Sequence, residues 1–162
     1  MSDFSPPISD IRFLIHDVIG LDTVSRLPPF GETSPDLVDA ILEEAGKFAA
    51  SVLAPLNRVG DQEGAKLLAD GTVGTPTGWK EAYAQFCEGG WQGISAPENE
   101  GGMGLPILLG AAVAEIWQSA NMAFALCPML TSGAIEALTA HGSEQQRKLY
   151  LSRLVSGEWT GT

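Results

Sequence analysis

Residues 107–120 read Ile-Leu-Leu-Gly-Ala-Ala-Val-Ala-Glu-Ile-Trp-Gln-Ser-Ala, and this stretch decides the fold class. Its apolar side chains surround the segment instead of forming one stripe, which is typical of a helix that is covered on several sides. Pro106 stands where it opens a helix, so we predict a central helix that runs to about Ser119. On one side, the helix is expected to pack against the core of this domain. On another side, the sequence leaves open whether a second domain, a second subunit or a ligand covers it.

The predicted central helix lies in an uncharged part of the chain. No Lys or Arg occurs between Lys80 and Arg147, and Glu115 is the only charge in residues 101–135. Polar residues and Pro128 interrupt this part, which argues against a membrane-spanning run of about twenty apolar residues. We expect Glu115 to be a hydrogen-bonded buried acid and not a catalytic one.

Outward from this helix, five more segments have helical periodicity between a capping residue and a stop. They run from Ser9 to Gly20, from Ser34 to Pro55, from Thr75 or Thr77 to Gly89, from Ser132 to His141, and from a capping-box pattern at Ser143 to Gly157. Loops are predicted over residues 22–33, 57–75 with a turn at Asp70-Gly71, and 91–105. The sequence therefore predicts an all-α fold of about six helices with long loops. We divide it into an N-terminal extension with one short helix (residues 1–33) and a helical domain (residues 34–162).

Composition excludes several classes of partner. The 162 residues carry 9 Lys and Arg against 20 Asp and Glu, a formal net charge of −11, which disfavours binding to nucleic acid or to an anionic membrane. Cys87 and Cys127 form neither a disulfide framework nor a CxxC pair. Residues 1–7 hold no basic residue ahead of an apolar run, so no signal peptide is predicted. We expect a cytoplasmic protein with reduced thiols.

Motifs that carry chemistry are scarce. The chain has no GxGxxG, P-loop, HExxH or CxxC pattern, so we predict no catalytic, cofactor-binding or metal-binding residue within it. The sequence of residues 93–97 resembles the GxSxG pattern of a nucleophile elbow, but proline replaces the final glycine. His16 and His141 are far apart and are interpreted as structural, and Glu98 and Glu100 as solvated loop residues.

Two motifs resemble the acyl-CoA dehydrogenase family. Residues 90–104, Gly-Trp-Gln-Gly-Ile-Ser-Ala-Pro-Glu-Asn-Glu-Gly-Gly-Met-Gly, are similar to the family's segment from glycine-tryptophan through proline-glutamate to Gly-Gly-x-Gly. Residues 142–159 resemble the helix and Gly-Glu turn with which the family leaves its N-terminal helical domain. Residues 10–13, 42–48, 54–61 and 77–83 look like a longer bacterial branch that includes the 3-methylmercaptopropionyl-CoA dehydrogenases.

The resemblance implies oxidation of an acyl-CoA thioester between Cα and Cβ, with a glutamate base and FAD. It also implies electron transfer to an electron-transferring flavoprotein and a homo-oligomer. Only the N-terminal helical domain is matched, and the family's flavin-contacting segment and base would follow Thr162. We therefore expect a piece truncated before the β domain, which alone retains no FAD and is inactive.

The resemblance implies one functional surface in this chain. In the family, the acyl pocket is lined by the helix that follows the Gly-Gly-x-Gly loop, here called the glycine loop (residues 91–105), and by the turn after that helix. At the corresponding places this chain has Phe124, Ala125 and Pro128, which we predict to contact the substrate. Phe124 is equally well interpreted as ordinary core. A different class of function also stays open: a non-catalytic helical module of the same ancestry that binds a partner protein through its apolar face.

Overall fold

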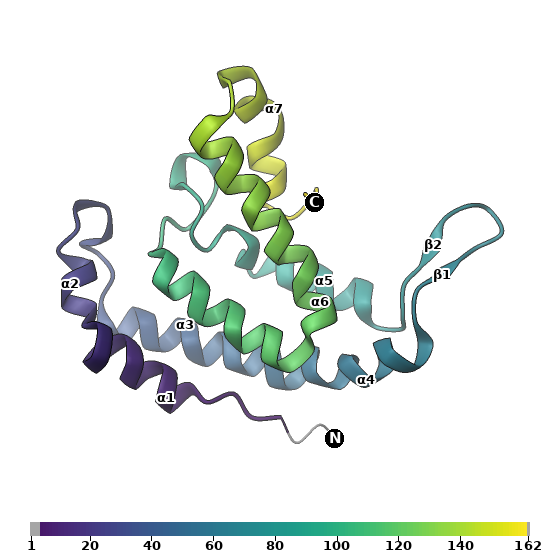
Figure 1. Ribbon diagram of the computed structural model, residues 1–162, viewed down its shortest axis with the longest axis horizontal. Helices are drawn as coiled ribbons and strands as arrows, with labels where there is room; N and C mark the ends of the chain where they lie inside the picture. The colour runs from purple at the N-terminus through teal and green to yellow at the C-terminus, as the bar shows by residue number, and fades with distance from the viewer. Residues whose placement is uncertain (1–3, 162) are drawn as a thin grey trace.

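The computed structural model describes residues 4–161, and most of these residues are helical (Figure 1). The α-helices are α1 (Ile8–Phe13), α2 (Leu21–Ser25), α3 (Pro35–Phe48), α4 (Ala54–Glu63), α5 (Trp79–Glu88), α6 (Ile107–His141) and α7 (Glu144–Val155). π-Helical turns follow α1 (Leu14–Ile19) and α3 (Ala49–Leu53), and 3-10 turns lie at Pro28–Phe30, Trp91–Gly93 and Glu98–Glu100. The two short strands are β1 (Lys66–Leu67) and β2 (Val73–Gly74). The all-α prediction is confirmed.

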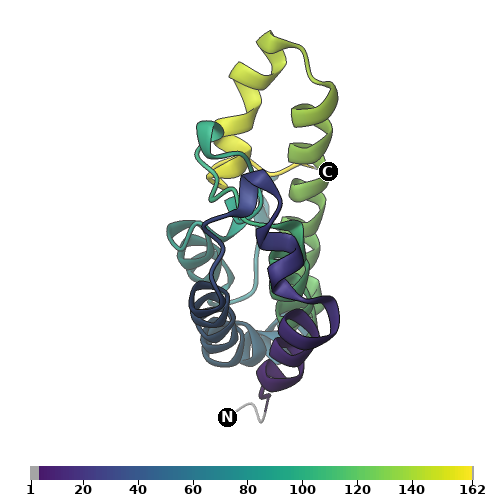
Figure 2. The same cartoon turned by 90° about the vertical axis from the view of Figure 1, so that its left-hand side faces the viewer.

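The core is continuous from the N-terminal segment to the middle of α6. Leu42 on α3, Phe86 on α5 and Val113 on α6 are each 0% exposed and belong to one cluster. A smaller cluster forms between α7, the second part of α6 and Ala96. Figure 2 shows α7 beside the second part of α6 at one end of the molecule, with α1 and α3 at the other.

The N-terminal extension contains more helix than predicted. Residues 22–33 were expected to be a loop, but Leu21–Ser25 forms α2 and Pro28–Phe30 a 3-10 turn. Gly20 has φ +82°, so the chain turns sharply there, and Leu21 is buried directly after it. Ile11, Ile15 and Leu21 belong to the same core cluster as α3 and α6, so the extension shares the core of the helical domain.

Pro55 does not end the third helix, which is a correction to the sequence prediction. The chain continues from α3 through the π-helical turn into α4, and Pro55 stands in the first turn of α4. A proline is tolerated in the first turn of a helix because an N–H at this position has no regular i→i−4 partner to lose, and the widened π turn before α4 interrupts the regular ladder. Residues 57–63 are therefore helical. The predicted turn at Asp70-Gly71 is confirmed, in a hairpin that pairs Lys66 with Gly74.

The predicted break between the central helix and the next one is much shorter than expected. The sequence predicts no helix over residues 120–131, whereas α6 runs from Ile107 to His141 with Asn121 as its one non-helical residue. Glu115 is exposed on this helix, so the prediction that it is buried is wrong. By length and composition alone α6 could cross a membrane. This is weak evidence, because the core helix of a soluble protein passes the same test.

Candidate functional site

Asn121 makes the bend that shapes the candidate site. Its backbone is extended (φ −157°, ψ 87°) and its side chain is 1% exposed. The Oδ1 atom accepts a hydrogen bond from the Phe124 N–H at 3.1 Å, as an N-cap does, so Asn121 starts the second half of α6. Its Nδ2 donates to the Leu53 carbonyl at 3.1 Å, at the end of the π-helical turn. The bend is thereby tied to the opposite wall of the core, and Figure 1 shows the two halves of α6 meeting at an angle.

A cavity of about 670 Å³ is lined by residues from both halves of α6 and from the segment that follows α5. This volume falls within the roughly 300–1,000 Å³ of small-molecule sites. The first half of α6 contributes Ile107, Gly110, Ala111, Ala114, Trp117 and Gln118; the second contributes Ala125, Pro128, Met129, Ser132, Gly133, Ile135, Glu136, Thr139 and Ala140. The remaining wall is Phe86, Trp91, Gln92, Ile94, Ser95, Ala96 and Pro97. Most of these side chains are small or apolar.

The glycine loop folds back on itself and supplies one wall. Met103 N–H donates to Gly93 O at 2.8 Å, and Gly104 N–H donates to Ala96 O at 2.9 Å. Gly102 lies so close to the Ala96 carbonyl that a Cβ atom at this position would overlap it. The glycines thus allow the loop to pack tightly against its own backbone.

Replacing Gly102 with alanine is expected to destabilise the chain by about 1–3 kcal/mol, because an overpacked backbone contact must be relieved by movement of the loop. Urea unfolding measures the loss. Gly31→Ala is the matched control, since its Cβ would meet no heavy atom within 4 Å. Equal stabilities of the two variants would contradict this account of the loop.

The same loop does not fit the phosphates of FAD. A nucleotide-binding loop leaves backbone N–H groups free to face the phosphate, whereas two of these N–H groups bond to the loop's own carbonyls. The Glu98 carboxylate also lies against Gly104, where a Cβ would be 3.1 Å from its Oε1. Negative charge at this place opposes phosphate binding. Within residues 4–161 no cluster of three or more His, Cys, Asp or Glu side chains could hold a metal ion.

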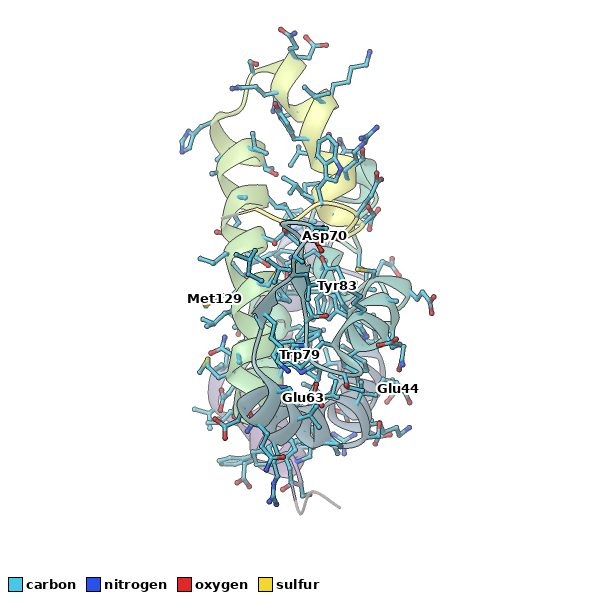
Figure 3. The ribbon with its side chains drawn as sticks, turned by 90° about the vertical axis from the view of Figure 1, so that its right-hand side faces the viewer. Glu44, Glu63, Asp70, Trp79, Tyr83 and Met129 are labelled. Atoms are coloured by element: carbon cyan, nitrogen blue, oxygen red, sulfur yellow. The ribbon has the colours of Figure 1, made fainter. Side chains whose placement is uncertain are left out.

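The structure separates the three residues predicted to contact substrate. Ala125 and Pro128 both line the cavity. Phe124 is buried in the aromatic core. The centroid of its ring lies 6.0 Å from the ring centroid of Trp79, 6.4 Å from that of Tyr83 and 6.0 Å from that of Phe86. In the view of Figure 3, Met129 is at the left of α6, whereas Trp79 and Tyr83 of α5 are to the right of this helix. The core interpretation of Phe124 therefore fits its position.

Sequence reasoning missed Gln92, which joins the loop to α6. The side chain is 5% exposed, and its Nε2 donates to Pro128 O at 3.2 Å and to Ser132 Oγ at 3.0 Å. Gln92 therefore fixes the distance between two walls of the cavity. The signal that could have found it is a polar residue between Trp91 and Gly93, inside the motif that carries the resemblance.

The cysteines are free thiols and Cys87 lies in an unreactive setting. Burial raises the pKa of Cys87, and burial also raises the pKa of the neighbouring Tyr83. The Tyr83 hydroxyl donates to Gly157 O at 2.9 Å and so holds the turn after α7 against α5. A thiol with a raised pKa stays protonated at neutral pH, so Cys87 is a poor nucleophile.

Comparisons with known proteins agree on one family. Residues 36–158 match the profile described as the acyl-CoA dehydrogenase N-terminal domain. The chain is 46% identical over 159 residues to a 3-methylmercaptopropionyl-CoA dehydrogenase of Ruegeria pomeroyi, covering 98% of this chain and 27% of that protein. It is 29% identical over 157 residues to a butyryl-CoA dehydrogenase of Syntrophomonas wolfei, covering 94% of this chain and 25% of that protein. The chain thus spans about a quarter of the length of these relatives, and it belongs to the acyl-CoA dehydrogenase family, whose N-terminal domain it matches.

Proposed function

We propose that this chain is the N-terminal helical domain of an FAD-dependent acyl-CoA dehydrogenase and that the cavity in the angle of α6 receives the acyl chain. The observation that carries the proposal is the cavity itself, whose small and apolar side chains suit a hydrocarbon chain. Ala125 and Pro128, predicted by resemblance as substrate contacts, line it. Phe124 is proposed to support this wall from the core behind it.

The proposed reaction removes a proton from Cα and a hydride from Cβ of the acyl group. Because the glycine loop is packed against its own backbone and does not fit the FAD phosphates, we propose that the residues that hold FAD lie outside residues 4–161. The glutamate base is proposed to lie outside them as well, as the family resemblance implies. The residues of this domain bind the chain, orient it and exclude water from it. On its own, the 162-residue chain is expected neither to retain FAD nor to oxidise an acyl-CoA.

The substrates proposed first are short acyl-CoA thioesters. The two relatives described above are named as dehydrogenases of 3-methylmercaptopropionyl-CoA and butyryl-CoA, and both of these acyl groups are short. Electron-transferring flavoprotein as the acceptor and a homo-oligomer are proposed from the family resemblance alone. A cytoplasmic location is proposed from the two unpaired cysteines, which are typical of a reducing compartment.

The test uses the complete polypeptide that contains this domain, purified with its flavin. Adding either acyl-CoA is expected to bleach the flavin absorbance, and adding an electron acceptor to restore it with formation of the α,β-unsaturated product. A folded, flavin-loaded protein that no acyl-CoA bleaches would contradict the proposal. That result, together with a stable complex with a partner protein, would favour the non-catalytic interaction module.

Gly133 offers a test of where the acyl chain lies. It lines the cavity, and a Cβ atom at this position would meet no heavy atom within 4 Å. Gly133→Leu is expected to fill this space and to lower kcat/KM for the longest accepted acyl-CoA at least ~10-fold relative to butyryl-CoA, since one methylene in a pocket is worth about 10–200-fold. The control is Gly31→Leu, at an open position outside the lining residues. An unchanged ratio in Gly133→Leu would place the chain elsewhere.

A further inference from the structure

One charged side chain lies on the cavity face of α6. The lining residues of its second half recur at helical spacing, from Ala125 through Met129, Ser132 and Gly133 to Glu136 and Thr139. Glu136 is therefore on the same helical face as Ala125 and Pro128. It is exposed, and among the lining residues it is the only one that carries a charge.

No cation of the described chain is placed to neutralise Glu136. The lining contains no Lys, Arg or His, and none of the ion pairs found within residues 4–161 involves Glu136. The sequence explains this, because Lys and Arg are absent between Lys80 and Arg147. The lining of the cavity thus carries one solvent-exposed negative charge that has no paired cation among the described residues.

We propose that Glu136 is a specificity-determining residue that rejects acyl-CoA thioesters whose acyl chain ends in a carboxylate and so restricts the site to uncharged chains. The inference rests on the proposed function, since it takes the cavity to hold the acyl chain. A terminal carboxylate entering the cavity meets the Glu136 carboxylate with no positive group in the lining to offset the repulsion. An uncharged chain of the same length meets no such penalty.

The experiment compares pentanoyl-CoA with glutaryl-CoA, which have five-carbon acyl chains that differ at the far end. The wild-type complete enzyme is expected to prefer pentanoyl-CoA in kcat/KM. In Glu136→Gln the preference is expected to fall about tenfold, which corresponds to ~1.4 kcal/mol of repulsion removed. In Glu136→Lys it is expected to fall further. The matched control is Glu115→Gln, which removes a charge from the same helix at an exposed position outside this cavity, and is expected to leave the ratio unchanged.

Each other outcome is decisive. An unchanged ratio in both Glu136 variants overturns the proposal, and so does an equal change in Glu115→Gln, which would reflect net charge alone. A folded, flavin-loaded wild-type protein that turns over no acyl-CoA, with pentanoyl-CoA, butyryl-CoA and 3-methylmercaptopropionyl-CoA all tested, overturns the proposed function, and with it this inference. Turnover of pentanoyl-CoA with an unchanged ratio overturns only the role of Glu136.

Discussion

Replacing Phe86 with alanine is expected to lower the free energy of unfolding by about 3–5 kcal/mol, the range found for large aromatic residues in cores. Phe86 is 0% exposed, and its ring lies 5.1 Å from Trp117 and 5.9 Å from Tyr83. Truncation removes the contact with Trp117 that joins α5 to α6 and the contact with Tyr83 within α5, and leaves a void that rigid aromatic neighbours cannot close. Urea unfolding followed by circular dichroism measures the loss.

The control for this prediction is Phe13→Ala. Phe13 is 58% exposed, so the same truncation is expected to change stability by less than about 0.5 kcal/mol. A loss below about 1.5 kcal/mol in Phe86→Ala would contradict the tight packing described here, because it would mean that the core relaxes into the space.

Asn121→Ala is expected to destabilise the chain by about 2–4 kcal/mol. The substitution removes both hydrogen bonds of a side chain that is 1% exposed, and leaves the Leu53 carbonyl without this donor and the Phe124 N–H without its cap. An unsatisfied buried group costs about 1–3 kcal/mol. Because the bend orients the second half of α6, kcat/KM of the complete enzyme is expected to fall as well.

Two further variants separate capping from burial. Asn121→Ser keeps an oxygen that can cap Phe124 but loses the bond to Leu53, so a smaller loss of stability is expected. Asn99→Ala truncates an exposed asparagine and is expected to change stability by less than about 0.5 kcal/mol. A loss of stability in Asn121→Ala no greater than that in Asn99→Ala would contradict the role assigned to the Asn121 side chain.

The sequence by itself determined the start of α3, the ends of α7 and the stop after α5, which have local signals. The predicted caps Ser9 and Thr75 or Thr77 are wrong, because α1 begins at Ile8 and α5 follows Gly78. Ser143 and Gln146 form the predicted capping box, with Ser143 Oγ accepting from Gln146 N–H at 3.2 Å and Ser143 N–H donating to Gln146 Oε1 at 2.9 Å. Gly89 follows α5 as predicted, and Ser34 caps α3. These signals are readable because cap and partner lie within four residues of each other.

The candidate site was only partly readable from the sequence. Ala125 and Pro128 came from the family resemblance and do line the cavity, whereas Glu136 falls in the same helical face without any motif to mark it. Glu115 illustrates the opposite error: a lone acid in an apolar stretch suggested burial, but helical geometry turns it outward. An uncharged stretch does not reveal which of its faces is covered.

Only the tertiary structure decided where helices bend and where a cavity opens. Pro55 stays helical because it follows a π-helical turn, and Asn121 bends α6 because Leu53, far away in the sequence, accepts its amide hydrogen. Gln92 holds the segment after α5 against the second half of α6 through its hydrogen bonds to Pro128 and Ser132, and this fixes the distance between two walls of the cavity. The hydrogen bonds of Asn121 to Leu53 and of Gln92 to α6 join segments that are far apart in the sequence, and their energy is gained only once the core has assembled, so no local pattern records them.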